Sequence, residues 1–108
     1  MKEIAMGAGS FDGQSQENKL AILNNCVEYL LKDKNKFRKV ESHIFYDFLN
    51  ESDVKKFRKE THVFRHHDRE AINAREDWSK RKKDFYIRMG IIIVTEVYFN
   101  TESNENIF

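Results

Sequence analysis

Basic side chains and aromatic rings alternate in three short clusters, and these residues have the clearest potential for chemistry in the chain. The clusters occupy residues 34–39 around Phe37, residues 55–59 around Phe57, and residues 81–83 just before Phe85. Lys and Arg neutralise phosphates, and aromatic rings can stack on unpaired bases. The basic residues from which we expect contact with a nucleic acid or another partner are Lys55, Lys56, Arg58, Lys59, Arg65, Arg69, Lys80, Arg81, Lys82 and Lys83.

The distribution of charge gives partial support to nucleic-acid binding. The formal net charge is only +1, but residues 51–90 hold twelve Lys or Arg against eight Asp or Glu, and residues 91–108 hold three acids and no base. A local basic face attracts polyanions even on a nearly neutral molecule. The sequence pI of about 7.9 lies below the range of typical nucleic-acid modules. An amphipathic helix with its rings inward and its cations outward explains the same pattern without any ligand.

The histidines define a second candidate site. His62 and His66 are four residues apart, so on a helix they share a face with Glu70, and this spacing suits a divalent metal. The chain has a single cysteine, Cys26, and lacks a His-Glu-x-x-His motif. We therefore predict no metal and no cofactor, with His62 and His66 as weak metal candidates and no catalytic residues.

A short likeness to a known enzyme family lies in the same region. His43 and the pair His67-Asp68 resemble the histidine and the His-Asp pair that hold a metal in the HD phosphohydrolases. The run before His67 is Val-Phe-Arg-His rather than a small apolar helix, and the chain is too short for that domain, so we interpret the match as coincidence. A metal-dependent hydrolase that uses these residues with His62 and His66 remains a remote alternative.

These side chains require a scaffold, and the absence of backbone breakers indicates its type. No glycine or proline occurs between Gln14 and Met89, so helix is the favoured conformation for most of that stretch. Apolar residues recur at steps of three and four from Leu20 to Leu31. They predict a first helix from Ser15, its N-cap, to about Lys34, followed by a turn within residues 32–39.

Two further helices and a strand complete the expected fold. A second helix over residues 40–49 is expected to bury Ile44, Phe45, Phe48 and Leu49. The third is expected to start at the cap residues 50–53, to break or leave the core near residues 66–70, to use Trp78 as an anchor, and to stop at Gly90. Residues 91–99 are β-branched and aromatic, a composition typical of a strand.

An internal near-repeat links two of these segments. Residues 36–45 return as residues 56–64 with one position dropped, and the exchanges Ser to Thr and Ile to Val keep the chemistry. Duplication of a helical hairpin and chance similarity between lysine-rich helical sequences remain equal alternatives. A true duplication predicts similar environments for His43 and His62.

The sequence therefore predicts a mainly α protein: a flexible leader (1–14), one helical domain of three helices and a C-terminal strand (15–99), and a loose tail (100–108). No membrane span or targeting segment is evident, so we expect an intracellular protein, cytoplasmic or nuclear. A non-enzymatic binding or regulatory protein, or an accessory subunit with a protein partner, is the leading hypothesis. DNA or RNA binding through residues 55–83 is the alternative, and the strand offers a route to a homodimer.

Overall fold

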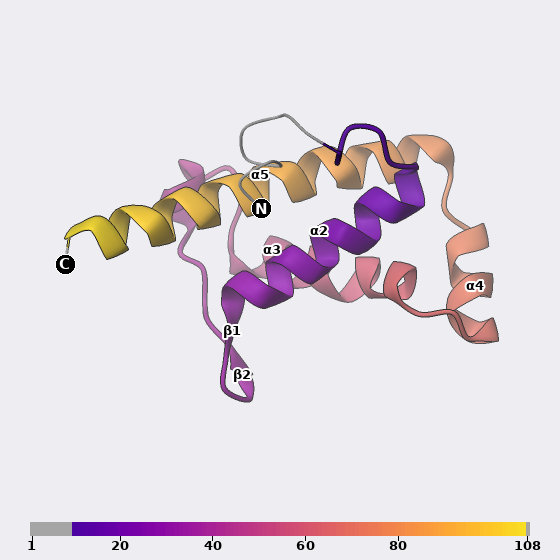
Figure 1. The fold of residues 1–108 in the computed structure, drawn as a ribbon, viewed down its shortest axis with the longest axis horizontal. Coiled ribbons are helices and arrows are strands. Elements are labelled where there is room, and N and C mark those ends of the chain that lie inside the picture. The colour runs from indigo at the N-terminus through magenta and orange to yellow at the C-terminus, as the bar shows by residue number, and fades with distance from the viewer. Residues whose placement is uncertain (1–9, 108) are drawn as a thin grey trace.

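The computed structural model describes the backbone of residues 10–107 and the side chains of residues 10–101. Within that part, the protein is mainly helical, with four α-helices, two short 3₁₀ helices and one small antiparallel hairpin. Figure 1 shows the long helix α5 across the top, with α2 lying diagonally against it and α3 behind. The predicted α class is confirmed, whereas the prediction of three helices is wrong.

Helix α2 (Gln16–Leu31) agrees with the first predicted helix. The side chain of Ser15 accepts a hydrogen bond from the Asn18 backbone amide, and Glu17 lies in the first turn, where the helix dipole favours a negative charge. Leu20, Leu23 and other members of its apolar stripe are buried. The predicted N-cap and stripe are therefore confirmed, although the helix ends before Lys34.

The basic segment after α2 forms a hairpin. Strand β1 (Lys32–Asp33) pairs antiparallel with β2 (Lys36–Phe37), with Lys32 opposite Phe37. Lys34 adopts a left-handed conformation (φ 59°), which a tight hairpin turn requires. The turn predicted within residues 32–39 is confirmed, and the hairpin projects from the helical body at the bottom of Figure 1.

The second predicted helix, over residues 40–49, is wrong. Only a 3₁₀ turn, η1 (Ser42–Phe45), forms there, because Tyr46 and Asp47 both adopt left-handed conformations that end it. Ser42 donates its hydroxyl to Asp47 Oδ1 at 3.0 Å, and the Asp47 amide donates to the Ser42 carbonyl at 2.9 Å. Phe45 is buried as predicted, but Phe48 is exposed.

Helix α3 (Glu51–Thr61) starts at the predicted cap residues. Asn50 Oδ1 accepts from the Asp53 amide at 3.0 Å, and Asp53 Oδ2 accepts from the Asn50 amide at 2.9 Å. Each side chain satisfies one backbone donor of the other residue, so together they form a capping box. Val54 and Phe57 are buried on the inner face of this helix.

The chain breaks after α3, in the region where a break was predicted. A 3₁₀ helix, η2 (His62–Arg65), ends in extended backbone at His66, and α4 (Arg69–Glu76) begins after Asp68. Asp68 caps α4 by accepting from the Ala71 amide at 2.9 Å. A further break at residues 77–79 separates α4 from α5, so the third predicted helix consists of distinct segments.

Helix α5 (Lys80–Ile107) shows that the predicted C-terminal strand and the predicted stop at Gly90 are both wrong. Residues 91–99 continue the helix, and the homodimer expected through a strand loses its basis. Buried positions recur at Ile87, Gly90, Val94 and Val97. This spacing of three and four places one apolar stripe against α2, with which α5 makes its most extensive contacts.

Gly90 lies where α5 packs closely against the side chains of α2 and α3. A Cβ atom there would lie 2.5 Å from Phe57 Cζ and 2.9 Å from Leu23 Cδ1. The glycine therefore lets α5 approach α2 and α3 more closely than any larger residue would allow. A glycine therefore occupies position 90 because the helices approach each other closely there, and not because a helix ends there.

The two halves of the near-repeat behave differently. Its first half is strand at Lys36–Phe37 but helix at the matching residues 56–57. In its second half, residues 43–45 and residues 62–64 both lie in 3₁₀ helices. In each run, the histidine is exposed, the following aliphatic residue is half-buried, and the phenylalanine is buried. His43 faces Glu41, whereas His62 faces Glu28 and His66, so the environments predicted to be similar differ.

In the part of the chain that the structure describes, no helix combines the length and apolarity that crossing a membrane requires.

Candidate partner-binding surface

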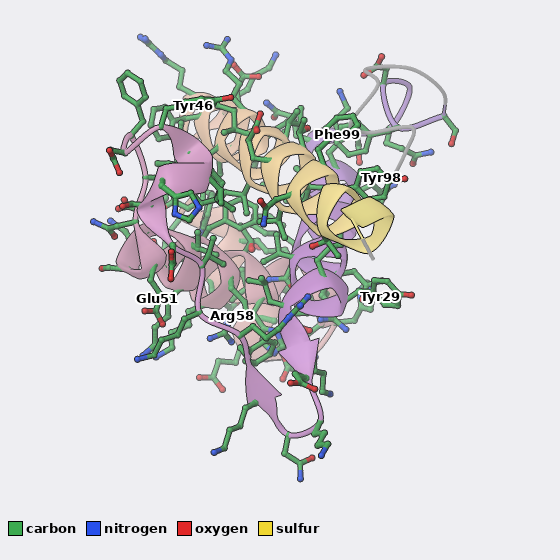
Figure 2. All side chains as sticks on the ribbon, turned by 90° about the vertical axis from the view of Figure 1, so that its left-hand side faces the viewer. Tyr29, Tyr46, Glu51, Arg58, Tyr98 and Phe99 are labelled. Atoms are coloured by element: carbon green, nitrogen blue, oxygen red, sulfur yellow. The ribbon has the colours of Figure 1, made fainter. Side chains whose placement is uncertain are left out.

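Two aromatic rings are exposed on the loop that joins η1 to α3. The side chains of Tyr46 and Phe48 are 78% and 88% exposed, and Figure 2 shows Tyr46 projecting away from the helical body. Tyr46 has φ 54° and is followed by Asp47 at φ 63°. A bulky residue with positive φ is uncommon and costs conformational energy, so an outlier of this kind motivates a functional hypothesis for the loop.

A groove lies between this loop and α5. It has a volume of about 260 Å³, and its wall residues from the loop and α3 include Phe48, Leu49 and Phe57, while those from α5 include Phe85 and Met89. Phe85 is itself 59% exposed. The groove is lined mainly by apolar side chains, and Asp53 and Lys56 supply the charges among its lining residues.

Packed aromatic side chains support the α5 wall of the groove. Trp78 packs edge to face against Phe64, with ring centroids 5.0 Å apart, and against Tyr86 at 4.6 Å. Burial and a hydrogen bond with Glu60 raise the pKa of Tyr86 to about 12. Trp78 is half-buried against the core, in the anchoring position that the sequence predicted.

The basic residues of α3 are partly engaged with their own neighbours. Lys56 Nζ lies 3.9 Å from Glu60 Oε2, one turn along the helix. The Arg58 guanidinium stacks 3.8 Å from the centre of the Phe37 ring and thereby covers a ring of the hairpin. Arg58 therefore has a structural role within this chain, whereas the exposed pair of Lys56 contributes little to stability.

The start of α5 shows the same division between engaged and free cations. Lys82 Nζ lies 4.1 Å from the centre of the Trp78 ring, and Lys83 Nζ lies 3.8 Å from Glu17 Oε1 of α2. Arg65 is held within the buried polar cluster described below. Some members of the predicted basic set are exposed and have side chains that make no hydrogen bond or ion pair among the described residues: Lys55, Lys59, Arg69, Lys80 and Arg81.

The aromatic rings of the three basic clusters differ in their exposure. Phe57 is buried, whereas Phe37 is 38% exposed and Arg58 stacks on its ring. Phe85 is the large ring of these clusters that is clearly exposed, and it lies on the apolar groove. The structure therefore buries the ring of the 55–59 cluster but keeps Phe85 beside the free cations Lys80 and Arg81, with which it lines a second hollow.

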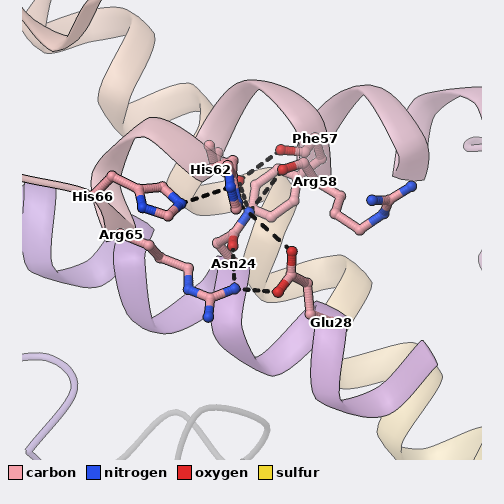
Figure 3. Close-up of polar contacts among 8 residues, drawn as sticks. Asn24, Glu28, Phe57, Arg58, His62, Arg65 and His66 are labelled. Atoms are coloured by element: carbon pink, nitrogen blue, oxygen red, sulfur yellow. Dashed lines mark hydrogen bonds and ion pairs between the residues drawn. The ribbon is translucent and has the colours of Figure 1, made fainter. Parts of the chain in front are cut away.

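A buried polar cluster connects α2 to the end of α3 (Figure 3). The fully buried Asn24 donates to the Arg58 carbonyl at 2.8 Å and to Thr61 Oγ1 at 2.9 Å, and it accepts from Arg65 Nη1 at 3.2 Å. Arg65 also pairs with Glu28. Every buried polar side-chain atom in the described residues has a partner, which identifies the cluster as a structural connection.

The two metal candidates meet at the edge of this cluster. His62 Nε2 and His66 Nε2 are 2.7 Å apart, and Glu28 Oε1 lies 3.7 Å from the other ring nitrogen of His62. Glu70 lines the same shallow hollow as the two histidines. No group of three or more His, Cys, Asp or Glu side chains within the described ranges has the geometry to hold a metal ion.

The sequence does not reveal the exposed aromatic loop, because apolar spacing places Phe48 on the buried face of a predicted helix. The capping box at the start of α3 indicates the correct position of Phe48. With Asn50 as N-cap, Leu49 occupies the preceding position, whose side chain often packs against the first turns of the helix. Phe48 then falls in the linker before the cap, where it is not positioned by a helical stripe.

Comparison of the chain with protein-family models, with curated proteins and with solved structures finds no match in any of the three.

Proposed function

We propose that this chain is a non-enzymatic binding or regulatory protein that engages a protein partner through the groove between the 46–49 loop and α5. The observation that carries the proposal is the exposure of Phe48 and Phe85 on the two sides of one apolar groove. Large exposed apolar side chains that gather in one place are unfavourable in water and mark interaction sites. Aromatic residues are also the side chains that contribute most at protein interfaces.

The size of the groove favours a side chain over a small-molecule ligand. Its volume of about 260 Å³ falls below the roughly 300–1,000 Å³ of typical small-molecule sites. One or two apolar side chains from a partner helix or loop fit such a space. Because Phe57 and Leu49 of its wall pack on the protein's own core, the groove has a rigid base on which an anchor residue can rest.

The backbone of the loop supports the same interpretation. Tyr46 and Asp47 hold left-handed conformations that the hydrogen bonds to Ser42 maintain. This conformation keeps Tyr46 in solvent instead of folding it onto the core. A loop backbone held by such hydrogen bonds loses less conformational entropy on binding, which favours recognition.

Site-directed photocrosslinking tests this proposal. A benzoylphenylalanine at position 48 should form an adduct of defined mass in an extract of the native source, and the variant Phe85→Ala should reduce its yield. The matched control is the same probe at position 29, because Tyr29 is 74% exposed but lies on α2. Equal adduct patterns from positions 48 and 29, or adducts unaffected by Phe85→Ala, would contradict the proposed site.

Nucleic-acid binding remains the second candidate function, supported by the free cations Lys55, Lys59, Arg69, Lys80 and Arg81. Because Phe57 is buried, such binding would rest mainly on phosphate contacts and weaken steeply with salt. Fluorescence anisotropy with mixed oligonucleotides at two salt concentrations tests it, with K80E/R81E as the variant. No binding at low salt removes this candidate.

We expect the protein to act inside the cell, cytoplasmic or nuclear, as proposed from its sequence.

A further inference from the structure

Helix α5 carries a second apolar surface on the side opposite the core. Phe85, Ile92 and Phe99 are 59%, 42% and 44% exposed, although the same helix buries Ile87 and Val94 on its inner side. The three exposed residues are seven positions apart and therefore lie along one face of a helix. In Figure 2, Phe99 lies above the α5 ribbon, whereas α3 lies below it. We call Phe85, Ile92 and Phe99 the outer stripe.

The outer stripe is symmetric about Ile92. Phe85 lies seven residues before it and Phe99 seven residues after it, about 21 Å from end to end. The flanking charges follow the same symmetry, because Arg88 lies four residues before Ile92 and Glu96 four residues after it. Two copies of α5 that run antiparallel and cross at Ile92 would therefore pair each Phe85 with a Phe99 and each Arg88 with a Glu96.

The charge along α5 selects the same antiparallel direction. Residues 80–88 hold Lys80, Arg81, Lys82, Lys83 and Arg88 against the single acid Asp84, and the rest of the helix holds acids and no base. Parallel helices would place the two basic ends together. Antiparallel helices place each basic end beside an acidic end, and complementary charges of this kind fix the direction of pairing.

Arg88 is available for such a contact. Its side chain is 73% exposed and pairs with Asp84 one turn away on the same helix, at 2.7 Å. A pair this exposed contributes little on its own, so the guanidinium can also reach a carboxylate on a second helix. Two antiparallel copies would each supply one Arg88 and one Glu96, which gives two equivalent interhelical pairs around the central Ile92.

We infer that this protein forms an antiparallel homodimer through the outer stripe of α5, with the two-fold axis at Ile92. Such an interface is isologous, because the same residues contact their counterparts from both copies. The groove lined by Phe48 opens beside the stripe and shares Phe85 with it. The dimer needs only the purified chain and does not rest on the proposed partner; because both surfaces use Phe85, the dimer and the partner compete for that ring.

A single helix pair forms a small interface compared with the roughly 800 Å² per partner of standard complexes. The dimer is therefore expected to dissociate in the micromolar range. Sedimentation equilibrium of the purified full chain should show concentration-dependent association from the 13.0 kDa monomer. A single monomeric species at every concentration through the high micromolar range would overturn the inference.

Variants at the two-fold axis and at the charge pair test the interface directly. Ile92→Asp places two carboxylates together and should weaken association at least about tenfold. Tyr29→Asp, a matched change at an exposed ring of α2, should leave association unchanged. Glu96→Arg should also weaken it, whereas R88E/E96R should restore it. Failure of the double exchange to restore association in variants with unchanged circular dichroism would contradict the charge pairing.

Disulfide trapping determines the direction of the helices. In a Cys26→Ser background, Phe85→Cys and Phe99→Cys should each give little covalent dimer alone and form a mixed disulfide when combined. Parallel helices would crosslink each variant with itself. Self-crosslinking of Phe85→Cys without the mixed product would therefore refute the antiparallel arrangement.

Discussion

Gly90 provides the sharpest test of how the core is packed. By helix propensity alone, Gly90→Ala should stabilise α5 by about 1 kcal/mol, because glycine is the weaker helix former in a helix interior. The structure predicts the opposite sign. The new Cβ would approach Phe57 Cζ to 2.5 Å and Leu23 Cδ1 to 2.9 Å, distances at which something must move.

The expected magnitude follows from the surroundings of these two atoms. Phe57 and Leu23 are both buried, so neither side chain can swing into solvent to make room. Overpacking in a core of this kind typically costs about 1–3 kcal/mol, and the cost here should lie in the upper part of that range. After the gain in propensity is subtracted, we expect a net loss of about 1–2 kcal/mol in the free energy of unfolding.

Urea denaturation followed by circular dichroism measures this loss, with thermal melting as a second readout. For a domain of this size, 1 kcal/mol corresponds to roughly 4–8 °C in melting temperature. Asn100→Ala is the matched control, because Asn100 is an exposed position of the same helix and should change stability by only a few tenths of a kcal/mol.

A second variant tests the cause of the loss. Phe57→Leu removes the ring atom nearest to Gly90 and should cost less in the G90A background than in the original protein. If Gly90→Ala instead raised stability by about 1 kcal/mol, or if the two changes were strictly additive, the close approach of α5 to Phe57 would be refuted.

Three further changes probe other contacts. Asn24→Ala leaves the Thr61 hydroxyl and a backbone carbonyl without their buried donor, so chemical denaturation should show a loss of about 2 kcal/mol. Asn50→Ala removes half of the capping box and should cost about 1 kcal/mol by the same measurement. Because the pKa of Tyr86 is raised from 10.0 to about 12, the unfolded chain loses that proton first, and stability should fall as pH rises from 10 toward 12. Tyr86→Phe should reduce this fall in thermal melts, and an unchanged pH profile would contradict the raised pKa.

The starts of α2 and α3 could be found from local sequence. Ser15 and Asn50 cap α2 and α3 as predicted, because capping depends on side chains that lie within three residues of the helix start. The stripe of α2 was likewise evident from spacing alone. These features depend on local hydrogen bonds and on periodicity, both of which the sequence carries directly.

The secondary structure of residues 91–99 depended on packing against the rest of the chain. Their β-branched composition predicted a strand, yet they form helix because Val94 and Val97 extend the stripe that α5 buries against α2. Strand propensity is a weak preference that burial against a neighbouring helix overrides. The same contact explains why Gly90, which resembled a helix stop, instead lies where α5 approaches Phe57 most closely.

Identification of the candidate partner-binding surface also required the tertiary structure. Apolar spacing identifies residues suited to burial, but it does not show whether a partner element within the same chain covers them. The sequence placed Phe48 on a buried helical face and Phe85 in a basic cluster. Both rings are exposed because the η1 loop turns outward at Tyr46 and no described element covers the outer side of α5. The sequence by itself determined a helical protein with capped segments and an apolar core. Only the packing of α5 on α2 and α3 decided which of its rings remained in solvent, because exposure depends on contacts between residues far apart in the chain.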